Sequence, residues 1–148
     1  MSGAESHSRG VEAANIELIR RYRAAPVAQR HEFYGPSYRT IRKGLHNVAA
    51  LTGPSEPGRP GYTQASIPDR VDEIQHIVAH GDRVWATWLV KGTHRGRLFG
   101  IEGTSRPVEM LELGIWTVRD GQLAEGWFMA DELALLRQLG LRQLPPLG

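Results

Sequence analysis

A strand, a tight turn, a second strand and a short helix follow one another in the last third of the chain, and this succession constrains the fold most. Residues 107–118 and 122–130 are predicted strands, joined by an Arg-Asp-Gly turn. A helix is expected over about residues 131–139. It ends at Gly140, since glycine readily takes the left-handed conformation found just after a helix.

A second hairpin and two helices are predicted upstream. Residues 71–79 and 83–93 carry alternating apolar side chains and flank a glycine-containing turn. Apolar residues at helical spacing predict a helix over residues 11–24, and a shorter helix is expected over residues 27–33. Residues 37–51 are ambiguous. Helices followed by at least four antiparallel strands and a last helix indicate an α+β fold.

The predicted strand over residues 83–93 has apolar side chains on both faces. Val84 and Trp88 lie on one face, and Trp85 and Leu89 on the other. Both faces of such a sheet must be covered. Helices can cover one of them, and a partner subunit is the simplest cover for the other. The pattern therefore predicts a homodimer formed through the sheet.

Length and composition are those of one soluble domain. The 148 residues are 41% hydrophobic, and we expect a disordered tail over residues 1–10 and a single domain over residues 11–148. The N-terminus has no apolar signal core and no apolar run is long enough to span a bilayer, so a cytoplasmic location without membrane association is expected. The absence of cysteine excludes disulfides and Cys-based zinc sites.

The charge pattern argues against a nucleic-acid partner. The net charge is only +2, and the arginines are scattered among acids without interleaved aromatic residues. The densest cluster, Arg20, Arg21 and Arg23, is expected on a solvated helix face. A different feature, the Gly-, Pro- and Ser-rich stretch at residues 52–66, predicts a long loop. Such a loop is either a lid over a site or a mobile surface segment, and both interpretations stay open.

Four segments of the second half resemble the SnoaL-like branch of the nuclear transport factor 2-like superfamily. They are HGDRV at residues 80–84, GTHRG at 92–96, VRDGQL at 118–123 and a closing ExWxxxD…LLxQLG pattern within 125–140. The resemblance implies N-terminal helices packed on a curved antiparallel sheet, with a conical pocket between them. The best-known members close rings of aromatic polyketides by intramolecular aldol reactions in secondary metabolism, such as antibiotic biosynthesis. They use no metal and no organic cofactor, so neither is expected here.

Asp131 is the first candidate catalytic residue. It matches the family position whose carboxylate acts as general acid and base, and burial beside Trp127 and Met129 would raise its pKa towards the working pH. A purely structural interpretation also holds, because an aspartate directly before a helix is a common N-cap.

Gly114 is the main departure from the family, whose ring-closing members often have a histidine there. A glycine would widen the pocket locally, because it has no side chain. His76 is the candidate substitute, since strict alternation places it on one face with Ile74 and Val78. The alternative is a hydrogen-bonded core histidine.

Glu112 is the third candidate, since it shares a strand face with Met110, Gly114 and Trp116. If that face lines the pocket, a second carboxylate there would separate the two pKa values into an acid and a base. Such a pair also suits epoxide opening. The alternative is an outward-facing glutamate.

The predicted substrate is a hydrophobic small molecule, such as a polycyclic one, held in an apolar slot. His94 has mainly a structural interpretation within its GTH segment, while Tyr38, His31 and His46 could also point into the cone. The tryptophans could equally be core and dimer interface. The candidate substrate-binding residues are Trp127, Trp116, Met129, Trp88, Tyr34 and His94.

The sequence is therefore compatible with three functions. The first is a cofactor-independent polyketide cyclase or isomerase that acts on an apolar carbonyl substrate through carboxylate acid/base catalysis. The second is an epoxide hydrolase or epoxide-opening ether cyclase, which relies on a carboxyl pair. The third is a non-catalytic small-ligand-binding module, for which a pocket filled by Trp116 and Trp127 would be decisive.

Overall fold

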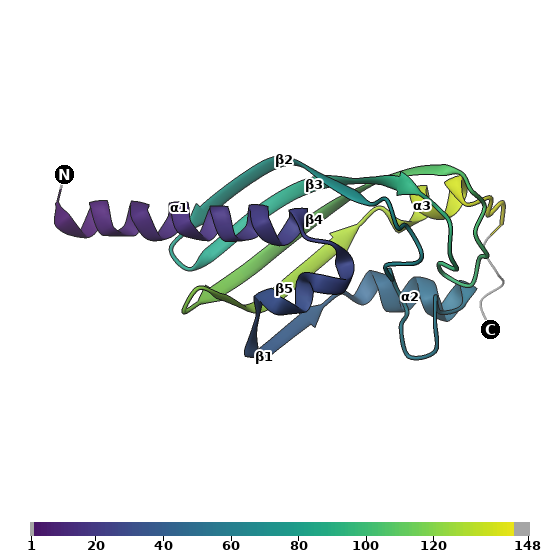
Figure 1. Cartoon of the computed structure of the whole chain (residues 1–148), viewed down its shortest axis with the longest axis horizontal. Helices are drawn as coiled ribbons and strands as arrows, with labels where there is room; N and C mark the ends of the chain where they lie inside the picture. The colour runs from purple at the N-terminus through teal and green to yellow at the C-terminus, as the bar shows by residue number, and fades with distance from the viewer. Residues whose placement is uncertain (1, 144–148) are drawn as a thin grey trace.

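Three α-helices, a 3-10 helix and five strands make up the computed structural model, which describes residues 2–143 (Figure 1). The α+β class predicted from the sequence is confirmed, as are both hairpins and the last helix. The elements are α1 (Gly3–Ala24), η1 (Val27–Phe33), β1 (Tyr34–Ile41), α2 (Lys43–Thr52), β2 (Val71–His80), β3 (Arg83–Thr93), β4 (Pro107–Arg119), β5 (Gln122–Ala130) and α3 (Glu132–Gln138).

The first helix begins earlier than its apolar pattern suggests. Ser2 and Glu5 form a capping box, in which each side chain accepts a hydrogen bond from the other residue's backbone N–H. The tail predicted over residues 1–10 is therefore helical from Gly3 on. These exposed first turns extend past the ends of the strands (Figure 1). A polar, uncovered surface produces no apolar periodicity, and for this reason the sequence pattern starts only at Val11.

The sheet is mixed and has the strand order β1-β5-β4-β3-β2. The pairs β2-β3, β3-β4 and β4-β5 are antiparallel, as the hairpins predict. β1, in contrast, pairs with β5 in parallel. The ambiguous residues 37–51 thus divide between the end of β1 and most of α2. β1 was not predicted because it lies at the sheet edge and is half-exposed, so that its side chains do not alternate.

The two faces of the sheet have different environments. On the inner face, Val84 and Trp88 of β3 pack against Ile19 and Tyr22 of α1, and all four are buried. α1 lies along this face, mainly against β2 and β3 (Figure 1). None of the described helices is long and apolar enough to span a membrane. On the outer face large apolar side chains stay exposed, namely Val71, Val78, Trp85, Leu111, Leu113, Trp127 and Met129.

Candidate functional site

A cavity of about 350 Å³ opens between the inner face of the sheet, α1, η1 and α2. Its inner part is formed by buried side chains that include Tyr22, Arg23, Arg30 and Glu112. Its mouth is marked by the exposed lining residues Thr40, His46, Gly58 and Arg59. The position and size are those of a small-molecule site.

The long loop between α2 and β2 forms one wall of this cavity. Gly61 lies against Leu45 of α2 so closely that a Cβ would approach a Leu45 methyl to 2.3 Å. Ser55 accepts a hydrogen bond from the backbone N–H of Phe99, and Ser66 donates one to the carbonyl of Arg97. These contacts hold Tyr62 in the lining, where its hydroxyl lies 3.2 Å from the sulfur of Met110. The loop predicted at residues 52–66 is thus a packed wall.

Three arginines from three segments converge on one buried carboxylate, that of Asp72 in β2. Arg70 Nε, Arg30 Nη2 and Arg23 Nε lie 2.7, 2.9 and 3.1 Å from its oxygens. Burial raises the pKa of Asp72, but Arg70, Arg23 and Arg30 outweigh burial and hold that pKa below its usual range. Asp72 therefore joins α1, η1 and the end of the loop beneath the cavity.

Glu112 of β4 faces the cavity and forms the centre of a second ionic cluster. Its Oε1 accepts a 2.7 Å hydrogen bond from Arg42, whereas its Oε2 lies 3.6 Å from Arg70 and has no hydrogen-bond partner. Burial raises the pKa of Glu112, but Arg42 and Arg70 outweigh it, so that the net shift is downward and the group is ionised. Glu132 of α3 lies 3.5 Å from the same Arg42 nitrogen, and burial raises the pKa of Glu132.

Of the three predicted catalytic residues, Glu112 lines the cavity and the other two do not. Asp131 is exposed, and its Oδ1 accepts the backbone N–H of Ala134 as an N-cap. His76 is also exposed. A β-bulge between Ile74 and His76 reverses the alternation, so that Ile74 and Ile77 face inward while His76 faces outward. The expectation that His76 and Ile74 share a face is wrong for this reason. The catalytic roles of Asp131 and His76 stay predictions.

The predicted substrate-binding residues other than His94 are divided among three places. Tyr34 lines the cavity, as does His46. Trp88 and Trp116 are fully buried in the core, where their rings stack at 5.5 Å. Trp127 and Met129 lie on the outer face of the sheet, 50% and 72% exposed.

His94 is buried away from the cavity in a loop contact. Its Nδ1 lies 2.9 Å from Thr104 Oγ1 and accepts the backbone N–H of Thr104. Burial lowers its pKa, so the neutral form is favoured. This is the structural environment expected for the GTH segment.

Gly114 does not widen the cavity, contrary to the sequence-based expectation. A Cβ at this position would come within 2.7 Å of Trp116 and 2.8 Å of Trp88. The two indoles therefore occupy the space beside the glycine. The stacked tryptophans thus leave no room for the histidine that the family resemblance led us to expect at this position.

Sequence reasoning missed the arginines of the cavity and Glu132. Arg23 was expected on a solvated face, but it is 4% exposed and lies over the ring of Trp88 at 4.5 Å. The sequence did contain a sign that these two side chains are buried. Arg23 follows the apolar Ile19 by one helical turn, and Glu132 shares a helical face with Leu135 and Leu136. Asp72 likewise has the inward parity of Ile74, and a buried carboxylate requires cationic partners.

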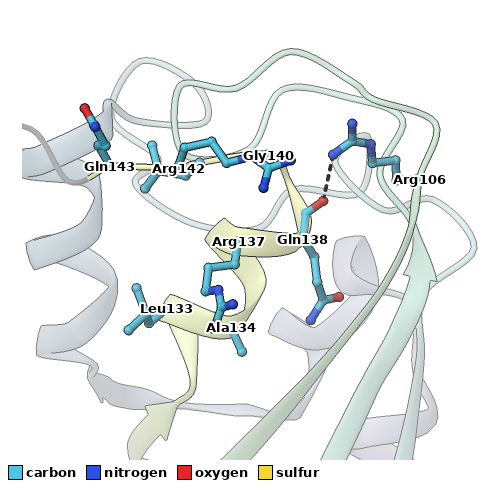
Figure 2. A pocket seen from close by; sticks show the side chains of 9 residues that line it. Arg106, Leu133, Ala134, Arg137, Gln138, Gly140, Arg142 and Gln143 are labelled. Atoms are coloured by element: carbon cyan, nitrogen blue, oxygen red, sulfur yellow. Dashed lines mark hydrogen bonds between the residues drawn. The ribbon is translucent and has the colours of Figure 1, made fainter.

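A second hollow lies at the far end of α3, with a volume of about 630 Å³ (Figure 2). Arg106 donates a 3.3 Å hydrogen bond to the carbonyl of Gln138 at its rim, and Arg137 and Leu133 line it. None of its lining residues is buried. It is larger than the cavity, but its surface position and lack of buried polar groups make it the weaker candidate.

Solved structures with the same fold come from several bacteria. A protein assigned to the SnoaL-like polyketide cyclases in Jannaschia sp. CCS1 is 17% identical, with 90% of this chain and 96% of that chain covered and a TM-score of 0.67. TsrD from Streptomyces laurentii is 22% identical, with 86% and 96% covered and a TM-score of 0.64. IdmH from Streptomyces antibioticus, assigned as a polyketide cyclase, is 26% identical, with 87% and 98% covered and a TM-score of 0.59.

The part of the chain that matches a known family includes several of the residues that line the cavity. The sequence model of the SnoaL-like polyketide cyclases matches residues 62–139, from Tyr62 in the loop to the end of α3. The match includes Arg70, Asp72 and Glu112. A search of curated proteins finds no match. Since the matched segment is more than half of the chain and the fold agrees, the chain belongs to the SnoaL-like polyketide cyclase family.

Proposed function

We propose that the chain is an enzyme that moves a proton at the carbon beside a carbonyl group, with Glu112 as the base, and so promotes ring closure or isomerisation of a small substrate. One observation carries the proposal: Glu112 is an ionised, buried carboxylate in the cavity lining, and its Oε2 has no hydrogen-bond partner. Arg42 donates a hydrogen bond to Glu112 Oε1 and so fixes the orientation of the carboxylate, including that of Oε2.

The reaction balances without a further reactant. Glu112 Oε2 takes the proton, and the electron pair of the C–H bond moves to the carbonyl oxygen as an enolate. The enolate carbon forms a C–C bond with a second carbonyl carbon of the same molecule, whose oxygen then takes the proton back from Glu112. A carboxylate with a lowered pKa is a weak base, so the step depends on stabilisation of the enolate. Arg42 and Arg70, which lie beside Glu112 in the lining, supply positive charge for it.

The cavity supports this proposal over the two alternatives. Glu112 is the one carboxylate among the described residues that line it, whereas the epoxide-opening hypothesis relies on a pair. The ligand-binding hypothesis would be favoured by a pocket filled with indole rings. Trp116 instead lies in the core and Trp127 on the outer face, and neither lines the cavity. Phe128, Leu45 and Val27 provide apolar surface for a hydrophobic substrate.

Exchange of the C2 protons of 1-tetralone, a neutral bicyclic ketone, in deuterated water tests the proposed base. NMR should show catalysed exchange with the wild-type chain. We expect Glu112→Gln to lose about 10²- to 10⁴-fold of this rate, because the amide cannot take a proton. Rates are measured below the unfolding temperature of each protein, since Glu112→Gln also removes a partner of Arg42.

Asp131→Asn is the matched carboxylate-to-amide control. Asp131 is exposed and outside the cavity, so this variant should keep the wild-type exchange rate. Loss of exchange in Asp131→Asn, with exchange retained in Glu112→Gln, would instead identify Asp131 as the base. No acceleration by the wild-type chain would contradict proton transfer at a ketone.

The outer face of the sheet supports a homodimer as the working form of the enzyme. Trp85, Leu111, Leu113, Trp127 and Met129 lie on neighbouring strands, and each is at least 40% exposed. A contiguous apolar face of this kind is unusual for a monomer. Trp127→Glu should convert a dimer into a monomer in light scattering at micromolar concentration, because it buries a charge in the interface. Leu133→Glu, a change of an exposed leucine on α3, should leave the dimer intact. A monomeric wild-type chain would refute the assignment.

A further inference from the structure

The cavity is strongly cationic for a site that also has apolar walls. Five guanidinium groups line it, and Glu112 is the one lining carboxylate among the described residues. Asp72 and Glu132 lie behind the lining and pair with some of these arginines. Even when both are counted, five guanidinium groups are balanced by only three carboxylates. The arginines come from α1, η1, the start of α2 and the long loop, and they are Arg23, Arg30, Arg42, Arg59 and Arg70.

Part of the hydrogen-bonding capacity of these arginines is unused. Arg42 Nε is buried and has no hydrogen-bond partner. Arg23 Nε also makes no hydrogen bond, although it lies 3.1 Å from Asp72. Burial is the main cause that lowers the pKa of Arg30 to about 10, and the neighbouring positive charges of Arg23 and Arg70 lower it further. Buried cations with free donors are costly unless an anion completes them.

We propose that the substrate of this cavity carries a carboxylate, which the arginines hold while the apolar body of the substrate lies against Phe128 and Leu45. A carboxylate fits the planar fork of donors that an arginine presents. Arg59 is exposed at the mouth and attracts the anion, and Arg42 has a free donor further in. This inference rests on the proposed function only in that the cavity is the substrate site.

Isothermal titration with 2-naphthoate and 2-naphthamide tests the preference for an anion, because the two probes have nearly the same shape. At neutral pH and low salt the wild-type chain should bind the acid about tenfold or more tightly than the amide, the ratio expected for one charge-assisted hydrogen bond. Added salt should weaken binding of the acid and leave the amide unchanged. Equal affinities, or no binding of the acid at millimolar concentration, would overturn the proposal.

Two arginine variants locate the binding of the anion. Arg59→Gln changes an exposed residue at the mouth, so the fold should be kept, and it should weaken binding of the acid several-fold without affecting the amide. Arg97→Gln changes another exposed loop arginine, which pairs with Glu102 outside the cavity, and should have no effect. The same response in both variants would contradict binding in this cavity.

Glu112→Gln separates this inference from the proposed function. The substitution removes a negative charge from the lining, so the variant should bind 2-naphthoate more tightly than the wild-type chain. It should at the same time lose the exchange of 1-tetralone protons. If the wild-type chain binds 2-naphthoate but does not exchange the protons of 1-tetralone, the carboxylate inference holds and the proposed function fails. If it exchanges the protons but does not bind 2-naphthoate, the proposed function holds and the carboxylate inference fails.

Discussion

Replacement of Asp72 with alanine is expected to lower the free energy of unfolding by about 3–5 kcal/mol, because it leaves buried charges without a partner. The Asp72 side chain is fully buried, and Arg23, Arg30 and Arg70 lie within 3.1 Å of its oxygens. Alanine would leave these three guanidiniums to repel one another beside the core. Urea titration followed by tryptophan fluorescence measures the loss.

The matched control is Glu73→Ala on the next residue of the same strand. Glu73 is exposed and pairs with Lys91 at the surface, so this variant should have nearly wild-type stability. Similar losses in both variants would contradict a special role of the buried cluster.

The same carboxylate gives the stability a dependence on pH. The pKa of Asp72 is held below its unfolded value of roughly 3.9, so its contribution is complete above that value and is lost as the pH falls through the folded pKa. Glu112 acts in the same direction. Asp72→Ala should therefore lose less of its remaining stability on acidification than the wild-type chain does.

Introduction of a histidine at Gly114, the residue type that the family resemblance implies there, is expected to destabilise this chain. Even a Cβ would lie 2.7–2.8 Å from the stacked rings of Trp116 and Trp88. We expect Gly114→Ala to cost about 1–3 kcal/mol through overpacking, and Gly114→His to cost more. Thermal unfolding by calorimetry measures both.

Gly10→Ala is the control for a glycine-to-alanine change. Gly10 lies in the exposed part of α1, where an added methyl group would have no neighbour within 4 Å, so alanine should stabilise the helix by about 0.5–1 kcal/mol. Opposite signs at the two positions would show that packing decides the effect at Gly114. An unchanged stability of Gly114→His would mean that the indoles move aside at little cost.

The sequence was most informative where one face of an element is buried and the other is not. β3 and β4 alternate regularly, and their pattern predicted the hairpins, the α+β class and the strand face that Glu112 shares with Met110 and Trp116. Whether this face points inward stayed open until the structure was known. It was least informative where the period is interrupted. The bulge after Ile74 turned His76 outward, and no local signal at that position specifies an extra residue.

The arrangement of the candidate site depends on contacts between segments far apart in the chain. Arg23, Arg42 and Arg70 each belong to a different segment of the chain. Single arginines contributed by separate segments form no recognisable sequence motif. Their convergence on Asp72 and Glu112 results from the packing of α1 and the long loop against the sheet.

The sequence by itself determined the two hairpins, the last helix and the α+β class, because these follow from local periodicity and turn chemistry. Four short segments within residues 80–140 in addition carried the family resemblance. Tertiary structure alone decided that Asp131 caps a helix outside the cavity, that two indoles fill the space beside Gly114, and that the pocket is lined with arginine. The physical reason is that side-chain period specifies which way a residue points, whereas charge neutralisation and packing depend on which distant segments meet.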